Sequence, residues 1–322
     1  MVTTTSLQPN LEFPKIIQNQ DSLDRDEFLA WATKNKKSIA ATLRLHGAIL
    51  FRDFPIKDPV DFNDFVESLG IESLPYIGGA AVRHQVYKNV HTTNESPPDQ
   101  FIPFHHEMSQ VPQYPQCLFF YCDVAPLKGG ETPLLQSDVL YNRVNELFPS
   151  FIAKLEKEGV IYTRIIPKED DPSSPVGRGW KSTFQVKDKE SAKIAASKLN
   201  VTLEWLPNGD VKTVSPILPP IKTLANAFNR KVFFNSAIAA YTGTADSRND
   251  PKKSVCFGNG EYFDDNVIQE ISKIMHDLSV AIPWKKGDVV FIDNNQVMHS
   301  RSPNFTPPRK IMAFLGLNCP YE

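Results

Sequence analysis

Apolar residues recur at helical spacing in five segments of this chain. In residues 24–45 they return every three or four positions, which places them on one face of a helix. Asp58 followed by Pro59 provides an N-cap and a favoured first residue for a second helix, and Gly159 provides a stop for a third. The pattern predicts helices over residues 24–45, 58–69, 137–158, 191–199 and 261–281.

Short apolar runs bounded by glycine or proline lie between these segments and predict strands. Asn208-Gly209, at the centre of residues 202–214, is a strong signal for a hairpin turn. Further strands are predicted over residues 46–52, 87–93, 104–108, 118–122, 160–166, 231–235, 289–293 and 310–317, with another after the turn at residues 129–134. The predicted loops are residues 94–99, 170–179 and 242–259.

Composition shifts this picture towards a β-rich core with elaborate connections. The chain has 26 prolines against 15 glycines, and proline interrupts both helices and central strands. Strands come from both halves of the 322 residues, and no linker divides them. We therefore predict one α+β domain over residues 1–322, in which residues 1–20 form an extended lead-in.

Net charge and cysteine content limit the possible binding partners and the cellular compartment. A formal net charge of −2 gives no global field for nucleic acid or an acidic membrane surface. We find no signal-peptide pattern and no apolar stretch long enough to span a bilayer. Four cysteines without a CxxC pair favour a reducing cytoplasm over a zinc finger or a disulfide framework. No sequence pattern specifies an oligomeric state.

The strongest chemical signal is the pair His105 and Glu107 within the predicted strand 104–108. On a strand, residues i and i+2 point to the same side, so both could bind one metal ion while His106 points away. His299 follows another predicted strand and could supply a third ligand. Two histidines and one carboxylate on one face leave coordination positions open, which is the arrangement of non-haem Fe(II) oxygenases.

Two further residues could hold an organic acid beside such a metal. Arg309, ten residues after His299, precedes a predicted strand and could form a two-pronged pair with a carboxylate. Thr132 could add a hydroxyl donor, and Lys310 is a lesser candidate for the role of Arg309. Two alternative functions are a metal-storing or metal-sensing β-barrel protein and a cupin-type isomerase or sugar-binding module. Neither alternative needs an arginine and a threonine that bind a carboxylate beside the metal.

Together these stretches resemble the Fe(II)- and 2-oxoglutarate-dependent oxygenases of the taurine dioxygenase and clavaminate synthase type. The similarity runs from about residue 45 to the end of the chain, and the order and spacing of its pieces make it specific. The matching pieces are residues 46–52, 104–108, 129–133, 177–180, 234–235, 284–288 and 307–309. The resemblance implies a double-stranded β-helix (jelly-roll, cupin-like) core of mainly antiparallel strands, with flanking helices and long loops.

The resemblance also implies roles for individual residues. By position, His105, Glu107 and His299 are implied to bind iron, and Arg309 and Thr132 to bind the distal carboxylate of 2-oxoglutarate. Fe(II), 2-oxoglutarate and O2 are then required. The implied reaction hydroxylates an unactivated C–H bond of a small molecule, such as an amino acid or a derivative, and releases succinate and CO2. Desaturation or ring closure on the same scaffold is the alternative.

The sequence departs from the commoner family pattern at two positions. Glu107 stands where aspartate is more usual, as in the clavaminate synthase branch, and its carboxylate argues against halogenation. Ala313 stands where many members carry a second arginine, which weakens the case for a sulfonate substrate. Weaker candidates for substrate contacts are Asn94, Arg178, Trp180 and Asn235. A surface loop with an aromatic anchor explains Arg178 and Trp180 equally well.

Overall fold

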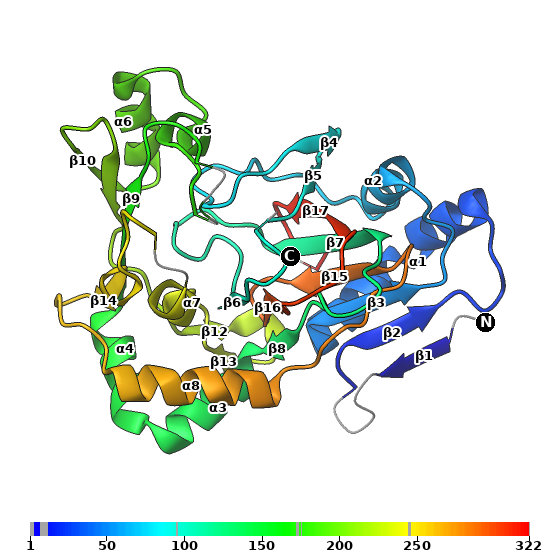
Figure 1. Cartoon of the computed structure of the whole chain (residues 1–322). Coiled ribbons are helices and arrows are strands. Elements are labelled where there is room, and N and C mark those ends of the chain that lie inside the picture. The colour runs from blue at the N-terminus through cyan, green and yellow to red at the C-terminus, as the bar shows by residue number, and fades with distance from the viewer. Residues whose placement is uncertain are drawn as a thin grey trace.

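Two facing β-sheets form the centre of the protein (Figure 1). The structure, a computed structural model, describes residues 3–6, 12–94, 96–171, 174, 176–243 and 246–321. All pairs in the large sheet are antiparallel except β2 with β3. Its strand order is β1 (Thr3–Ser6), β2 (Lys15–Gln18), β3 (Ala48–Arg52), β15 (Val289–Asp293), β7 (Cys117–Val124), β17 (Lys310–Gly316), β5 (Val90–Thr92), β4 (Gln85–Tyr87).

A smaller antiparallel sheet packs against the inner face of the large one. Its strand order is β6 (Ile102–His105), β16 (Val297–Arg301), β8 (Leu134–Gln136). Because side chains alternate along a strand, Leu118 and Phe120 of β7 share one apolar cluster with Leu134 of β8 and Val297 of β16. This sandwich of mainly antiparallel strands confirms the predicted double-stranded β-helix.

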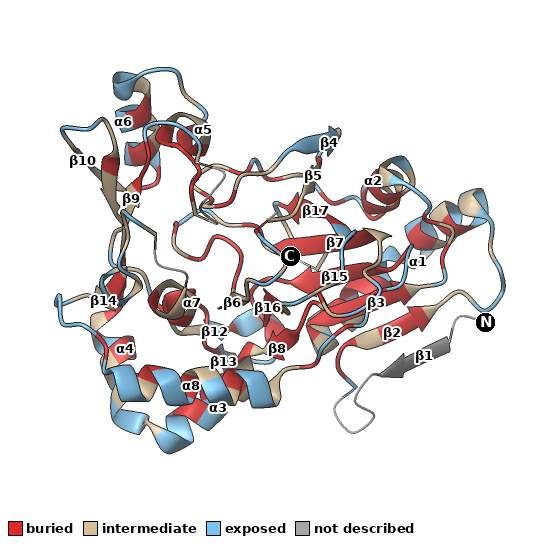
Figure 2. Cartoon of the chain, in the orientation of Figure 1, coloured by how far each residue is buried: buried red, intermediate tan, exposed pale blue. Residues whose placement is uncertain are grey.

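Helices α1 (Arg25–His46) and α2 (Pro59–Ser68) cover the outer face of the large sheet. The predicted helical face is confirmed, since the ring of Phe28 stacks on that of Phe65 at 4.8 Å and both belong to the cluster containing Phe119 and Phe291. The start of α1 is fixed by a capping box between Asp24 and Glu27. Figure 2 shows strands β3, β7 and β15 mostly buried and the solvent-facing sides of α1 and α2 exposed.

Helices α3 (Ser137–Leu147), α4 (Pro149–Glu158) and α8 (Asp265–Leu278) cover the outer face of the small sheet. The prediction of one continuous helix over residues 137–158 was wrong. Pro149 lacks an N–H to bond to the preceding turn, so the chain ends α3 at Leu147 and begins α4 at Pro149. The apolar spacing nevertheless continues across the break, which is why both helices pack on the same cluster.

A four-stranded sheet with two short helices extends one side of the molecule (Figure 1). Its strand order is β10 (Thr202–Trp205), β11 (Val211–Val214), β9 (Val160–Ile166), β14 (Val255–Phe257). The predicted hairpin is confirmed, with Gly209 at φ +90°. The remaining elements are α5 (Trp180–Phe184), α6 (Lys189–Lys198), β12 (Lys222–Leu224), η1 (Ala225–Ala227), β13 (Arg230–Val232), α7 (Ala237–Thr242) and η2 (Pro251–Lys253).

Several boundaries differ from the prediction. The predicted strand 231–235 ends at Val232, and the predicted loop 242–259 contains η2 and β14. Strand β16 and helices α5 and α7 were not predicted. The lead-in forms strands β1 and β2, while its residues 1, 2 and 7–11 lie outside the described part, as do residues 95, 172, 173, 175, 244 and 245 of the predicted loops. Among the described helices, none is long and apolar enough to cross a membrane.

Candidate active site

His105 and His299 face each other across two paired strands. They are direct partners in the antiparallel pairing of β6 with β16, so their side chains leave the same face of the small sheet. Their ring centroids lie 4.4 Å apart. The Nδ1 of His105 lies 2.8 Å from the main-chain oxygen of Pro103. A carbonyl only accepts, so Nδ1 carries the proton and Nε2 keeps a free lone pair.

Glu107 brings a carboxylate to the same point. Its Oε2 lies 3.7 Å from Nε2 of His299 and 4.0 Å from Nε2 of His105. One ligand atom from each residue lies within 4.8 Å of the other two, which is a spacing that can enclose a metal ion. Burial and the neighbouring His105 and Arg83 lower the pKa of His299 well below its ordinary value, so the ring stays neutral and able to ligate.

The prediction that Glu107 lies on the same strand as His105 was wrong. Strand β6 ends at His105, and Glu107 lies in the turn that follows, next to Met108 at φ +56°. The side chain of Asn294 holds this turn. Its Oδ1 accepts from the Glu107 N–H at 2.9 Å, and its Nδ2 donates to the Glu107 carbonyl at 3.0 Å and to that of Pro115 at 2.7 Å. The carboxylate of Glu107 therefore reaches the two histidines because the Asn294 side chain holds its turn. We call these three hydrogen bonds of Asn294 the asparagine clamp.

His106 points away from the triad, as expected. It is fully buried, its Nδ1 donates to the carbonyl of Asn294 at 2.5 Å, and the Ser137 hydroxyl lies 2.7 Å from its Nε2. Burial lowers the pKa of His106 to about 3, so the ring is neutral at physiological pH. The residue thus ties the Glu107 turn to the segment that leads into β16.

Arg309, just before β17, and Thr132, just before β8, lie close together near these residues. Arg309 Nε donates to the Gly130 carbonyl at 2.8 Å, and its Nη2 lies 3.5 Å from the Thr132 hydroxyl. The indole N–H of Trp284 also donates to the Thr132 hydroxyl, at 3.1 Å. The hydroxyl oxygen is then the acceptor in this bond, and the hydroxyl proton of Thr132 is free to be donated to another group. Burial lowers the pKa of Arg309 to about 10, so the guanidinium remains charged at neutral pH.

The main chain at Gly130, two residues before Thr132, requires a glycine. Its φ is +66°, in the region that favours glycine. A Cβ at this position would lie 2.9 Å from Cδ of Arg309 and 2.8 Å from Cβ of Phe305. The glycine therefore lets the guanidinium pass close to the main chain. Lys310, in contrast, pairs with Asp123 at 3.0 Å on a half-exposed surface.

One cavity of about 310 Å³ joins these groups, since all three members of the triad, Thr132 and Arg309 line it. This volume lies at the small end of the range for small-molecule sites. The two histidine nitrogens and the Glu107 carboxylate lie on one wall and face the cavity. This set of donors fits an iron ion. The Nδ1 of His299 is buried without a partner among the described residues, whereas its Nε2 faces the cluster. A charged guanidinium and a hydroxyl beside them fit an organic diacid.

Arg83 is a site residue that sequence reasoning missed. Its Nη2 lies 3.0 Å from both carboxylate oxygens of Glu107, and its side chain is 8% exposed. The guanidinium also lies over the ring of Tyr76, 4.1 Å from the centroid. It belongs to an irregular segment between α2 and β4, so no periodicity marked it.

The weaker substrate candidates are not brought together. Asn94 lines the cavity. Arg178 donates to the main-chain oxygens of Tyr76, Gly79 and Ser182, and Trp180 packs edge-on against Trp205 at 5.1 Å in the core. The Asn235 side chain bonds the main chain at Pro220 and Ala237. These three side chains therefore make structural contacts.

Comparison with known proteins shows the family to which the chain belongs. The model of the family "Taurine catabolism dioxygenase TauD, TfdA family" matches residues 4–315. A clavaminate synthase-like protein of Arabidopsis thaliana is 50% identical over 280 residues, which are 87% of this chain and 84% of that protein.

Solved structures show the same fold. A putative alpha-ketoglutarate-dependent 2,4-D dioxygenase from Burkholderia xenovorans aligns over 98% of this chain and 96% of that chain, with 16% identity and a TM-score of 0.54. AAD-2 in complex with Mn(II) and N-oxalylglycine aligns over 98% and 97%, with 13% identity and a TM-score of 0.55. The chain belongs to the TauD, TfdA family and is an Fe(II)- and 2-oxoglutarate-dependent dioxygenase.

Proposed function

We propose that the enzyme hydroxylates an unactivated C–H bond of a small molecule, with His105, Glu107 and His299 as its iron ligands. One observation carries this proposal. The three donor groups converge on a cavity that also presents a charged arginine, Arg309, which makes no ion pair within the described part of the chain. A storage or sensor protein needs a metal site but no such cation beside it.

The chemistry is divided between the bound groups and the chain. Iron and 2-oxoglutarate together supply oxidation, in which O2 provides one oxygen atom to the substrate and one to succinate as CO2 is lost. Arg309 pairs with the distal carboxylate of 2-oxoglutarate, and Thr132 donates a hydrogen bond to it. Trp284 orients the threonine. Phe120, whose ring lies 5.0 Å from that of His299, places an apolar surface beside the metal site.

The remaining parts of the proposal concern the chain as a whole. We treat residues 1–322 as one oxygenase domain, because β3 and β7 interleave with β15 and β17 in the large sheet. We place the enzyme in the cytoplasm, which is supported by the free thiols of its four cysteines. A carboxylate at Glu107 occupies the position that halogenases leave open, which supports oxygen insertion.

Products from a metabolite panel test hydroxylation against its alternatives. The wild-type enzyme is incubated with Fe(II), ascorbate, 2-oxoglutarate and a panel of amino acids and other small carboxylic acids. We expect a 2-oxoglutarate-dependent product that has gained one oxygen atom, measured by mass spectrometry. A product that has lost two hydrogens instead would overturn hydroxylation in favour of desaturation or ring closure.

Replacing Asn294 by alanine tests the clamp on Glu107. The variant frees the main chain of Glu107 on both sides, so we expect Fe(II) affinity to fall about 10- to 100-fold, as for other groups that orient a ligand. Asn295→Ala is the matched control, because Asn295 is also buried but bonds Gln116 and Tyr114. It should lower the thermal midpoint without changing the dissociation constant of Fe(II). Unchanged Fe(II) affinity in Asn294→Ala would remove the clamp from the account.

A further inference from the structure

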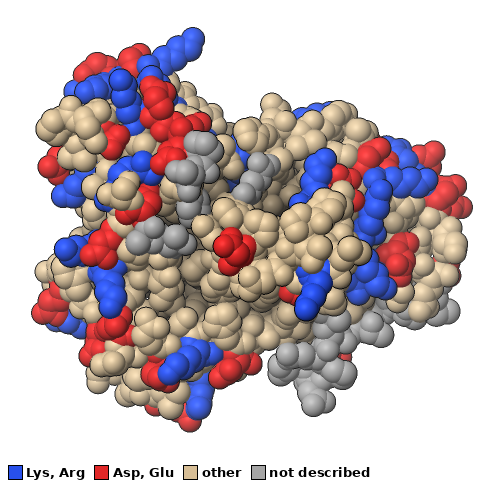
Figure 3. All heavy atoms as spheres, in the orientation of Figure 1, with Lys and Arg blue, Asp and Glu red and all other residues tan. Residues whose placement is uncertain are grey.

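The cavity interior is rich in arginine. Arg83, Arg164, Arg301 and Arg309 line it, and Glu107 carries the only carboxylate among its described lining residues. On the outer face drawn in Figure 3, acidic and basic side chains are instead interspersed. Positive charge is therefore concentrated inside the cavity, where screening by water is weakest.

Two of these four cations already have a task. Arg309 faces the proposed 2-oxoglutarate position. Arg301 donates to four main-chain oxygens, which belong to Asn94, Ser96, Pro97 and Gln100. Its role is to hold the segment that forms the cavity rim. Arg83 and Arg164 remain.

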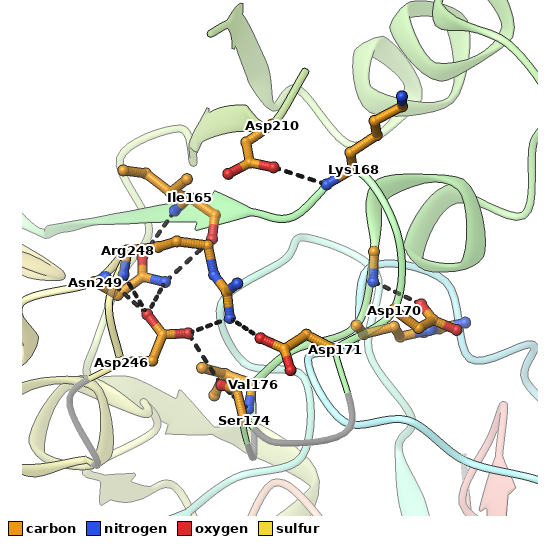
Figure 4. A network of polar contacts seen from close by, with 12 residues as sticks. Ile165, Lys168, Asp170, Asp171, Ser174, Val176, Asp210, Asp246, Arg248 and Asn249 are labelled. Atoms are coloured by element: carbon orange, nitrogen blue, oxygen red, sulfur yellow. Dashed lines mark hydrogen bonds and ion pairs between the residues drawn. The ribbon is translucent and has the colours of Figure 1, made fainter. Parts of the chain in front are cut away.

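Arg164 makes no ion pair within the described part of the chain. On strand β9 its Nη2 donates to the Arg178 carbonyl at 3.2 Å, and its Nε is buried without a partner. The nearby carboxylate of Asp246 is held by Arg248 at 2.8 Å, and Arg248 also pairs with Asp171 at 2.7 Å. Figure 4 shows Arg248 lying between the two aspartates. The acidic groups near Arg164 are therefore engaged elsewhere.

Arg83 shares its only described acidic partner with the metal site. Its guanidinium bonds Glu107, whose charge is also needed by a bound iron ion. The guanidinium groups of Arg83 and Arg178 lie 4.1 and 4.9 Å from the centroid of the Tyr76 ring. Of these two cations only Arg83 lines the cavity, and the contact with the Tyr76 ring holds it there without neutralising its charge.

The same cavity has an apolar wall of small residues. Ala239 and Ala240 of α7 and Gly243 after it line the cavity, together with Val176. Small side chains leave room for the body of a ligand. Ala313 is buried in the core between the sheets and supplies no charge.

We propose that the substrate is a carboxylic acid with an apolar body, whose carboxylate pairs with Arg164 and is assisted by Arg83. The apolar body lies against Ala239 and Ala240. This inference rests on the proposed function and names the substrate class of the same site. The anion-binding arginines come from β9 and from the segment before β4, and not from the position of Ala313.

Binding to an inactive complex tests this assignment. The enzyme is loaded with Mn(II) and N-oxalylglycine, and loading is measured first. Linear and aromatic monocarboxylic acids and amino acids are then titrated by calorimetry, each beside its primary amide. We expect acids to bind more tightly than their amides. Arg164→Gln should reduce that preference about tenfold or more, the usual scale for a hydrogen bond to a charged group.

Two further variants keep the test decisive. Arg164→Lys retains the charge and should keep part of the acid preference, which a merely structural role would not do. Arg143→Gln, on the exposed surface of α3, should leave the preference unchanged. Failure to bind Mn(II) and N-oxalylglycine counts against the proposed function. Normal loading with no preference for acids over amides, or a preference that survives Arg164→Gln, overturns this inference alone.

Discussion

Replacing His299 by alanine should lower succinate formation by more than about 100-fold. Changes in groups that only orient a metal ligand cost about 10- to 100-fold, and loss of a ligand should exceed that range. Glu107→Gln should have a similar effect, because it removes the negative charge of the metal ligand. The substitution is conservative in other respects, since glutamine has a similar shape and keeps an oxygen that can accept from Arg83. Fe(II) affinity by calorimetry and succinate by mass spectrometry measure both effects.

His84→Ala serves as the matched control for these variants, because His84 is exposed and does not belong to the triad. It should retain full activity. Thermal unfolding of each variant shows whether the fold survives, and we expect the metal-free proteins to remain folded. Wild-type succinate formation in His299→Ala or in Glu107→Gln would remove that residue from the proposed triad.

Replacing Arg309 by alanine should raise the 2-oxoglutarate concentration needed for half-maximal activity by at least about 30-fold. Truncating one partner of a buried, hydrogen-bonded charge pair costs about 2–5 kcal/mol, and about 1.4 kcal/mol corresponds to a factor of ten. Iron affinity should change little, because Arg309 bonds Gly130 and approaches Thr132 and does not touch the triad. A large rise in the 2-oxoglutarate requirement with little change in iron affinity would indicate loss of the cosubstrate site. Similar losses in both would indicate a general disturbance of the fold.

Lys310→Ala provides the adjacent control for Arg309. Lys310 pairs with Asp123 on the surface, so its loss should leave 2-oxoglutarate dependence unchanged. An equal rise in both variants would transfer part of the role to Lys310. Unaltered 2-oxoglutarate dependence in Arg309→Ala would exclude Arg309 from carboxylate binding.

Elements with strong local signals could be predicted from the sequence. The helix ending at His46 has a capping box at one end and Gly47 in the left-handed region at the other. Strand β16 had no such signal, because it is buried on both faces and three of its five residues are polar. Strand β15 is buried on both faces as well, but its continuous apolar run made it predictable, and β16 has no such run.

Residue types and chain order pointed to His105, Glu107 and His299, but not to the residues that support them. Asn294 reaches Glu107 from the turn between β15 and β16, and Arg83 reaches it from the segment before β4. Both contacts depend on which strands pair, and neither residue lies in a local pattern. Arg164 lies within the predicted strand 160–166, but its place on the cavity wall follows from how β9 pairs with β11 and β14.

Anaerobic spectroscopy tests the central claim most directly, namely that iron bound by the triad lies beside a 2-oxoglutarate site. Fe(II) is added to the purified wild-type protein, followed by 2-oxoglutarate, and the visible spectrum is recorded after each step. We predict a weak charge-transfer band that requires both additions and is lost in His299→Ala. Stoichiometric iron, shown by metal analysis, with no band at saturating 2-oxoglutarate would contradict the account.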